Sequence, residues 1–357
     1  MFQKRTAYFP LLLTYLLFLT ACVEQQAPES ATESSSSTTG KEVINVYTHR
    51  HYKGDQEIFT AFTEKTGIEV NVVSASADEL IKKLSLEGEK SPADVLITVD
   101  AGRLVRAKNK GLTQPIQVSD AVAAVPDKFK DKENQWIGLT YRARVLVYNP
   151  DKVAASDLSS YEGLTEEKWK NRILTRSSDN IYNQSLVASI IAHKGLSDTE
   201  KWAEGLVNNF ARPPKGNDRD QIKAVVAGIG DVAIVNSYYL GKMAFSSNKQ
   251  EREVAQKVGI FFPNQEDRGT HINVSGIAMT KHAPNPENAQ KLIDFLLTTA
   301  VQEQFASTNF EYPVLEDVPL HEMLTSWGEF KKDELPLHQL GEHHEEAVMI
   351  FDRIGWK

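Results

Sequence analysis

From residue 42 onward, short runs rich in β-branched residues alternate with longer stretches whose apolar residues recur every three to four positions. The short runs at residues 43–47, 68–73 and 94–99 are typical of buried strands. Between them, residues 58–66 and 77–87 have the spacing of helices that present one apolar face. Such alternation predicts a parallel sheet flanked by helices, with ligands bound beyond the carboxyl ends of the strands.

The same alternation resumes after Trp136. Further strands are expected at residues 144–148, 173–175 and 232–235, and further helices at residues 182–192, 199–210, 286–298 and 301–306. No internal repeat of 20 to 50 residues is visible, which disfavours a solenoid or a propeller. Because 357 residues exceed one ordinary core, we expect two α/β lobes with a cleft between them.

The first 40 residues are organised differently from the rest. Lys4 and Arg5 precede an apolar run at residues 8–19 that is shorter than the ~20 residues of a membrane-spanning helix, which predicts an exported signal peptide over residues 1–22. Residues 19–22, Leu-Thr-Ala-Cys, resemble the bacterial lipobox, so Cys22 is the expected lipidation site. Residues 23–40 are small and polar and predict a flexible tether between that lipid and the folded chain.

Charge and cysteine content argue against nucleic-acid binding and exclude a disulfide-stabilised fold. The chain carries 48 acidic and 40 basic residues, a net charge of -8, which offers no broad attraction for nucleic acid. Cys22 is the only cysteine, so an intrachain disulfide is impossible.

Candidate binding residues stand at three expected strand-to-helix junctions: His51-Tyr52, Tyr182 and Tyr238-Tyr239. A single tyrosine is more often a half-buried structural residue than a ligand. The adjacent pair Tyr238-Tyr239 is different, because it follows an apolar strand and the turn residues Asn236-Ser237, where a cleft is expected to open.

Several phenols and an imidazole form a distinctive donor set. A free tyrosine keeps its proton up to a pH of ~10, so only a strongly polarising cation displaces it. Zinc sites use Cys, His and carboxylate, and calcium prefers carboxylates and carbonyls. The hard donor set therefore favours Fe(III), and the surplus negative charge of the phenolates calls for a nearby cation such as Arg142.

Many ordered segments carry a family resemblance. They are Thr48-His49-Arg50-His51-Tyr52, Ser91-Pro92-Ala93-Asp94-Val95, Asp100-Ala101-Gly102-Arg103-Leu104, Tyr141-Arg142-Ala143-Arg144-Val145, Ile181-Tyr182-Asn183-Gln184-Ser185, Asp218-Arg219-Asp220-Gln221-Ile222, Asn236-Ser237-Tyr238-Tyr239 and Gly269-Thr270-His271-Ile272-Asn273. Through them the chain resembles the periplasmic ferric-binding proteins of ABC-type iron importers, especially their tyrosine-rich FutA-like branch.

The resemblance implies a type II periplasmic-binding-protein fold of two α/β lobes joined by crossover hinge strands. Lobe 1 would comprise residues 41–140 and 275–357, and lobe 2 residues 141–274. The family's iron-binding tyrosines fall on Tyr52, Tyr182, Tyr238 and Tyr239. His51 matches a position that is a ligand in some members only.

The resemblance also implies surrounding residues, an anion and partners. Arg142 matches an arginine beside the phenolates, whereas Lys242 stands where some relatives have a second arginine. A synergistic anion such as carbonate joins the iron in some branches. The protein would be a monomeric, non-enzymatic periplasmic lipoprotein that delivers Fe(III) to a membrane permease and its cytoplasmic ATPase.

Two other functions fit parts of the sequence. A polyamine or other organic-cation receptor would have an aromatic cleft with carboxylates, and an exported enzyme would use tyrosinate-bound iron for redox chemistry. The histidines of residues 338–344 could suggest a second metal cluster. However, residues 342–354 fit an amphipathic helix with solvated charges, which we favour.

Overall fold

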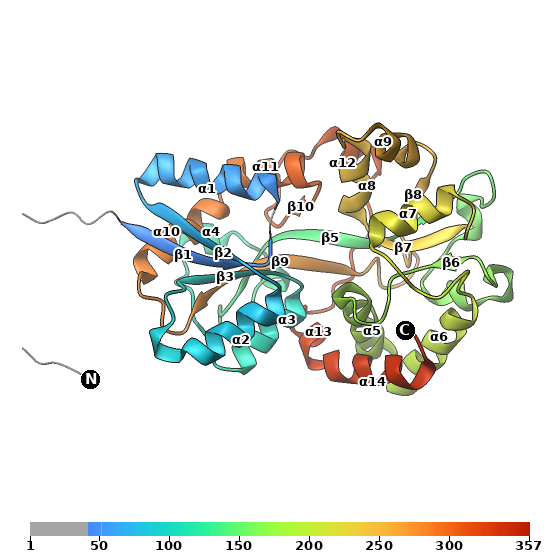
Figure 1. Ribbon diagram of the computed structural model, residues 1–357, viewed down its shortest axis with the longest axis horizontal. Helices are drawn as coiled ribbons and strands as arrows, with labels where there is room; N and C mark the ends of the chain where they lie inside the picture. The colour runs from blue at the N-terminus through green and yellow to red at the C-terminus, as the bar shows by residue number, and fades with distance from the viewer. Residues whose placement is uncertain (1–41, 51) are drawn as a thin grey trace, which may run out of the picture. The chain divides into compact units, whose positions relative to one another are not determined.

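The computed structural model describes residues 42–50 and 52–357 (Figure 1). The expected signal peptide, the lipidation site Cys22, the tether and His51 lie outside the described residues, and so these expectations stay predictions.

The described strands form one mixed sheet, in the order β2-β1-β3-β9-β5-β7-β6. β4 pairs with β9, and β8 and β10 pair with β5. The strands are β1 (Val43–Thr48), β2 (Glu69–Ser74), β3 (Val95–Val99), β4 (Thr113–Gln114), β5 (Ile137–Tyr148), β6 (Ile173–Leu174), β7 (Val232–Asn236), β8 (Gly259–Phe261), β9 (Ile272–Thr280) and β10 (Tyr312–Pro313).

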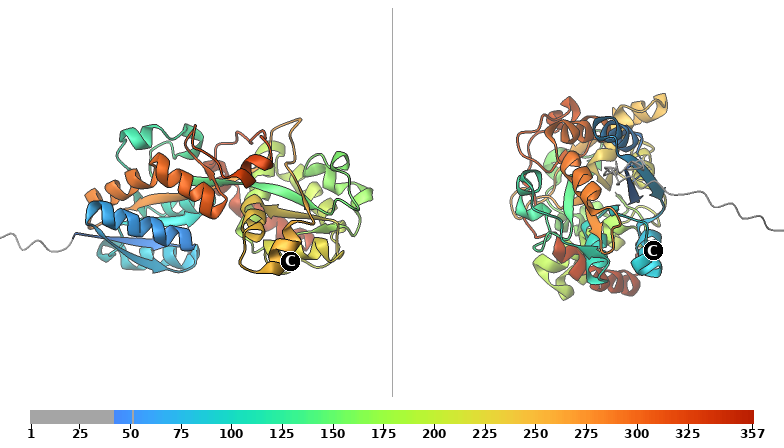
Figure 2. Two further views of the ribbon diagram at one scale, coloured as in Figure 1. Left: turned by 90° about the horizontal axis from the view of Figure 1, so that it is seen from above. Right: turned by 90° about the vertical axis from the view of Figure 1, so that its left-hand side faces the viewer.

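Helices cover both faces of this sheet (Figures 1 and 2). The α-helices are α1 (Lys53–Thr66), α2 (Ala77–Glu87), α3 (Ala101–Asn109), α4 (Asp120–Ala123), α5 (Ile181–Lys194), α6 (Leu196–Asn208), α7 (Asp218–Val226), α8 (Ser237–Ala244), α9 (Lys249–Ala255), α10 (Pro286–Leu296), α11 (Thr299–Asn309), α12 (Glu322–Ser326), α13 (His338–Glu342) and α14 (His344–Ile354). None of the helices in this part of the chain is long and apolar enough to cross a membrane.

Local sequence explains where the first helices begin and end. α1 ends at Gly67, whose φ of 76° suits glycine and whose N–H bonds the carbonyl of Thr63. α2 begins at Ser76, which forms a capping box with Glu79. The sequence predicted both helices, and the bounds of α2 agree with the prediction.

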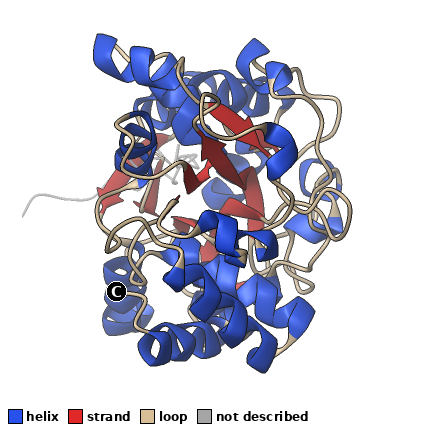
Figure 3. Ribbon diagram, turned by 90° about the vertical axis from the view of Figure 1, so that its right-hand side faces the viewer, coloured by secondary structure: helices blue, strands red, loops and turns tan. Residues whose placement is uncertain are grey.

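Successive side chains of a strand point to opposite faces of the sheet and pack into separate hydrophobic clusters. On β7, Val232 and Ile234 join a cluster with Leu186, Trp202 and Phe351 from α5, α6 and α14. The intervening Ala233 and Val235 point to the opposite face, where α7 and α8 pack. Seen from the side of β6 and β7, the strands accordingly lie between helices (Figure 3).

The mixed α/β class is confirmed, but the expectation of a parallel sheet is correct only in part. β1 pairs in parallel with β2 and β3, and β6 with β7, whereas β9 runs antiparallel to β3 and β5. β5 begins at Ile137, seven residues before the expected start at residue 144. β9 was not predicted, because Asn273, Ser275 and Gly276 interrupt its apolar residues and leave no continuous run like those of β3 and β7.

The C-terminal helix is confirmed as an amphipathic helix. α14 buries Ala347, Ile350 and Phe351 against α5 and α6. His343 pairs with Glu346 at 2.6 Å. In the described part of the chain, no group of three or more His, Cys, Asp or Glu residues is arranged to hold a metal ion.

His271, immediately before β9, makes stability depend on pH. It is 4% exposed, and burial, with the charges of Arg144 and Arg268 adding to it, lowers its pKa from 6.5 to about 3. Between pH 6.5 and about pH 3, His271 is therefore protonated in the unfolded chain but neutral in the folded chain. The contribution of this histidine to stability is present above pH 6.5 and is lost as the pH falls toward 3.

We expect the free energy of unfolding to fall by about 2–3 kcal/mol between about pH 7 and about pH 4.5 from this histidine alone. Urea unfolding curves at both pH values measure it. His271→Gln cannot titrate and should show a correspondingly smaller fall; an identical fall in variant and parent would contradict the assignment.

Candidate metal-binding site

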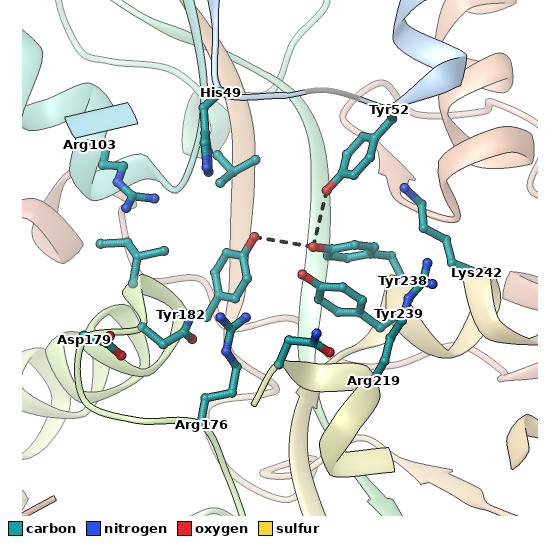
Figure 4. Close-up of a pocket in the computed structure, with 14 residues that line it drawn as sticks. His49, Tyr52, Arg103, Arg176, Asp179, Tyr182, Arg219, Tyr238, Tyr239 and Lys242 are labelled. Atoms are coloured by element: carbon teal, nitrogen blue, oxygen red, sulfur yellow. Dashed lines mark hydrogen bonds between the residues drawn. The ribbon is translucent and has the colours of Figure 1, made fainter. Parts of the chain in front are cut away.

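A cavity of about 640 Å³ opens between the segments that follow β1, β3 and β7 (Figure 4). The side chains that line it are His49, Tyr52, Val99, Arg103, Arg176, Asp179, Asn180, Ile181, Tyr182, Asn217, Arg219, Tyr238, Tyr239 and Lys242. All four tyrosines expected as ligands are among them, although Tyr52 and Tyr239 are 187 residues apart in the chain.

Each tyrosine stands at the beginning of a helix. Tyr52 is the N-cap of α1, Tyr182 is the second residue of α5, and Tyr238 and Tyr239 are the second and third residues of α8. The positive end of a helix dipole favours negative charge nearby. The three helices thus present phenols from different walls toward one another (Figure 4).

The hydroxyl of Tyr238 is the meeting point. Its oxygen lies 3.3 Å from that of Tyr52 and 3.4 Å from that of Tyr182. The ring of Tyr239 stacks on that of Tyr238 with centroids 4.2 Å apart. A small octahedral cation with ligands at ~2 Å sets neighbouring oxygens ~3 Å apart, so this spacing fits oxygens that share one ion.

The cavity favours the neutral form of three of these phenols. Burial raises the pKa of Tyr52, Tyr238 and Tyr239, and the neighbouring Tyr182 raises all three further. Arg142 offsets part of the increase at Tyr238. Deprotonation therefore requires a ligand with high positive charge density, as the donor types indicate.

Arg142 is not among the lining residues but is 1% exposed within β5. Its Nη2 donates to Ser275 and, at 3.3 Å, to Glu311. Its Nε and Nη1 have no hydrogen-bond partner in the described part of the structure. Arg142, the cation expected beside the phenols, therefore lies in the middle of a strand whose predicted start was too late.

Glu311 connects Arg142 to the wall that carries Tyr52. Its carboxylate is fully buried and accepts a hydrogen bond of 2.8 Å from Nη1 of Arg50. Arg50 also pairs with Asp55 of α1, and its guanidinium lies 5.0 Å from the ring centroid of Tyr52. Glu311 was not predicted, because it follows α11 without a recognisable motif.

Lys242 lies one turn beyond the tyrosine pair on α8. Its Nζ is 3.2 Å from the ring centroid of Tyr52, which is a cation–π contact. Burial lowers its pKa to about 8, although Glu311 raises it in part. Lys242, expected near the phenols, thus contacts the ring of Tyr52.

Most of the charged residues in the rest of the lining are cationic. Among those that the structure describes, Arg103, Arg176 and Arg219 are basic and Asp179 is the only acid. His49 lines the cavity as well, two positions before His51, which is outside the described residues. His49 belongs to the segment Thr48-His49-Arg50-His51-Tyr52, in which only His51 and Tyr52 were predicted as binding residues.

Comparisons with known proteins extend over most of the chain. The family description "Bacterial extracellular solute-binding protein" matches residues 57–332. "Iron uptake protein A1" of Synechocystis is 48% identical over 314 residues, which cover 88% of this chain and 87% of that protein. "Major ferric iron-binding protein" of Neisseria meningitidis serogroup A is 32% identical over 276 residues, 76% of this chain and 80% of that one.

A solved structure is similar as well. It is described as Trichodesmium IdiA (FutA) in complex with iron and citrate ligands, and it shares 49% identity with this chain. The TM-score is 0.85, with 88% of this chain and 100% of that chain covered. The likeness therefore concerns the whole arrangement of helices and strands.

The buried pairs of Glu311 predict a specific stability effect. We expect Glu311→Gln to reduce the free energy of unfolding by about 3–5 kcal/mol, because Arg50 and Arg142 would remain buried without their shared counter-charge. Asp198→Asn is the control: the pair of Asp198 with Lys201 is largely exposed, so its loss should cost less than about 1 kcal/mol. Guanidinium unfolding curves compare the two, and equal shifts would contradict the role of Glu311.

Proposed function

Since the chain belongs to the bacterial extracellular solute-binding proteins, within their ferric-iron-binding branch, we propose that it binds Fe(III). The ion would be held as a complex with tyrosinate side chains and delivered for import. The predicted type II periplasmic-binding-protein fold is the fold of its ferric-binding neighbours. Fe(III) is the cargo of the protein and not a resident cofactor.

One observation carries the proposal: three phenol oxygens from three helices converge at 3.3 and 3.4 Å, with a fourth phenol stacked beside them. Neutral phenols gain little from such crowding, and burial raises their pKa values. A trivalent hard cation is the ligand that makes use of this arrangement.

We assign Tyr52, Tyr182, Tyr238 and Tyr239 as the metal ligands, with His51 as a further donor. Four phenolates exceed the charge of Fe(III) by one. Arg142, buried and with two unpartnered N–H groups in the described structure, and Lys242 on the ring of Tyr52 supply positive charge around the complex.

The cavity has room for an anion beside the metal. Its volume of about 640 Å³ far exceeds one ion, and Arg103, Arg176 and Arg219 face it. Nη1 of Arg103 and Nε of Arg176 are buried with no hydrogen-bond partner among the described residues. Carbonate or a carboxylate chelator such as citrate, which accompanies iron in the Trichodesmium structure, fits this charge.

We further propose that residues 41–140 with 275–357 and residues 141–274 are two lobes that close on the ion. β5 and β9 would be the crossover strands, since both extend from the β1–β3 side of the sheet toward β7. Closure by hinge motion then presents the loaded protein to an ABC permease with its ATPase. Export and acylation at Cys22 would place it in the periplasm, on a lipid anchor.

The alternative functions find less support. An organic-cation receptor needs carboxylates against ammonium groups, but Asp179 is the only acid among the described lining residues. A redox enzyme needs an open coordination position, whereas four phenols and a histidine nearly fill the shell. The named relatives are binding and uptake proteins.

We expect Fe(III), added as its nitrilotriacetate complex, to produce a phenolate-to-iron charge-transfer band that saturates at one equivalent. Tyr238→Phe should weaken binding by more than the 10- to 100-fold typical of outer-shell changes, because it removes the oxygen on which the others converge while keeping the ring. Visible titration with EDTA as competitor measures it.

Tyr148→Phe serves as the matched control, since Tyr148 does not line the cavity, and it should bind as the parent does. A folded parent protein that gains no colour would refute the ferric proposal. Retained affinity in Tyr238→Phe would remove Tyr238 from the ligand set.

A further inference from the structure

Asp100 combines two locally unfavourable features. It is fully buried, and its backbone has φ 85° and ψ 120°, outside the left-handed helical region that aspartate tolerates. A non-glycine residue keeps such a conformation only where the surrounding structure imposes it, and such positions gather at functional sites. Asp100 follows β3 directly and is the N-cap of α3.

The carboxylate of Asp100 is held by neutral donors from three segments. Its Oδ1 accepts from the backbone N–H of Gly102 at 2.8 Å. Its Oδ2 accepts from Nδ2 of Asn273 on β9 at 2.7 Å and from Oγ of Ser185 on α5. Within the described residues, Asp100 takes part in no ion pair at salt-bridge distance.

Capping alone does not account for this residue. An N-cap needs one oxygen for the helix, and Ser or Asn would provide it without burying a charge. The second oxygen of Asp100 instead reaches across to β9 and α5. The use of a carboxylate is explained by this second set of bonds, since only a carboxylate accepts on both sides.

The hydrogen bond from Ser185 to Asp100 lies about one helical turn from Tyr182, a proposed ligand. Ser185 follows Tyr182 by three residues on α5, which places both on neighbouring turns. Val99, the residue before Asp100, packs against Ile181 and Tyr182 in the same small cluster and lines the cavity. Asp100 therefore joins the end of β3 to the helix end that presents Tyr182.

We infer that Asp100 is a positioning residue for iron capture, which through Ser185 holds the N-terminal turn of α5 so that the hydroxyl of Tyr182 meets that of Tyr238. The inference rests on the proposed function. Asp100 itself touches none of the four phenols in the described contacts; it acts on the ligand set through the helix.

The test compares two serines on the same helix. Ser185→Ala removes the bond to Asp100, whereas Ser189→Ala removes a buried hydroxyl that bonds only the carbonyl of Leu186. In the full chain, with ferric nitrilotriacetate as probe and EDTA as competitor, Ser185→Ala should weaken binding about 10- to 100-fold, as expected for the loss of a hydrogen bond to a charged acceptor. Ser189→Ala should stay within about twofold of the parent.

A second background separates positioning from general loosening. If Asp100 acts through Tyr182, the effect of Ser185→Ala should shrink to less than about twofold when Tyr182→Phe is already present. An undiminished effect in that background would overturn the inference, as would equal affinities of the two serine variants. If Ser185→Ala does not fold, Asp100→Asn takes its place and should weaken binding to the same extent. This variant keeps the oxygen that caps α3 but loses the oxygen that accepts from Ser185 and Asn273.

The outcome for the parent protein distinguishes the two proposals. Absence of the charge-transfer band in the folded parent refutes iron capture itself. A normal band in the parent together with no difference between the serine variants refutes only the role of Asp100.

Discussion

The arrangement of the cavity depends on the ion pairs of Glu311 with Arg50 and Arg142. This fully buried carboxylate binds Arg50 beside Tyr52 and Arg142 within β5. The bond to Arg50 joins residues 261 positions apart in the chain. Removing such charges from water is favourable only when their partners are held in place. The network therefore forms only when strand β5 has assembled with the segment that follows β1 and the segment that follows α11.

The phenols above this network experience the opposite constraint. Burial raises the pKa of Tyr52 and Tyr238, and the charges of Arg50 and Arg142 offset only part of the increase. The phenols therefore favour the neutral form, and ionising them would take a highly charged cation. The scarcity of carboxylates among the described lining residues fits this, because anions fixed there would raise the pKa values of the phenols further and would also attract organic cations.

Much of this could be predicted from the sequence, because strands and helices with regular apolar spacing, such as β1, α2 and β7, form from local pattern. The four tyrosines were found because they follow strands and because they match a family pattern. β9 was missed because Asn273, Ser275 and Gly276 interrupt its apolar residues, so that it lacks the continuous apolar run of β3 and β7. Glu311 was missed because its importance comes from partners brought to it by the fold. Long-range pairing of this kind has no local signal.

Arg142 and Asp100 share a property that bears on why the chain keeps them. Each is a fully or almost fully buried charge, and Asp100 adds a strained backbone; apolar residues of similar volume often replace buried charges without loss of stability. Both residues lie where separate segments meet below the phenols, on β5 and at the end of β3. Stability alone does not account for such features, whereas fixed placement of Tyr238 and Tyr182 would, since charge-assisted bonds are directional and apolar contacts are not.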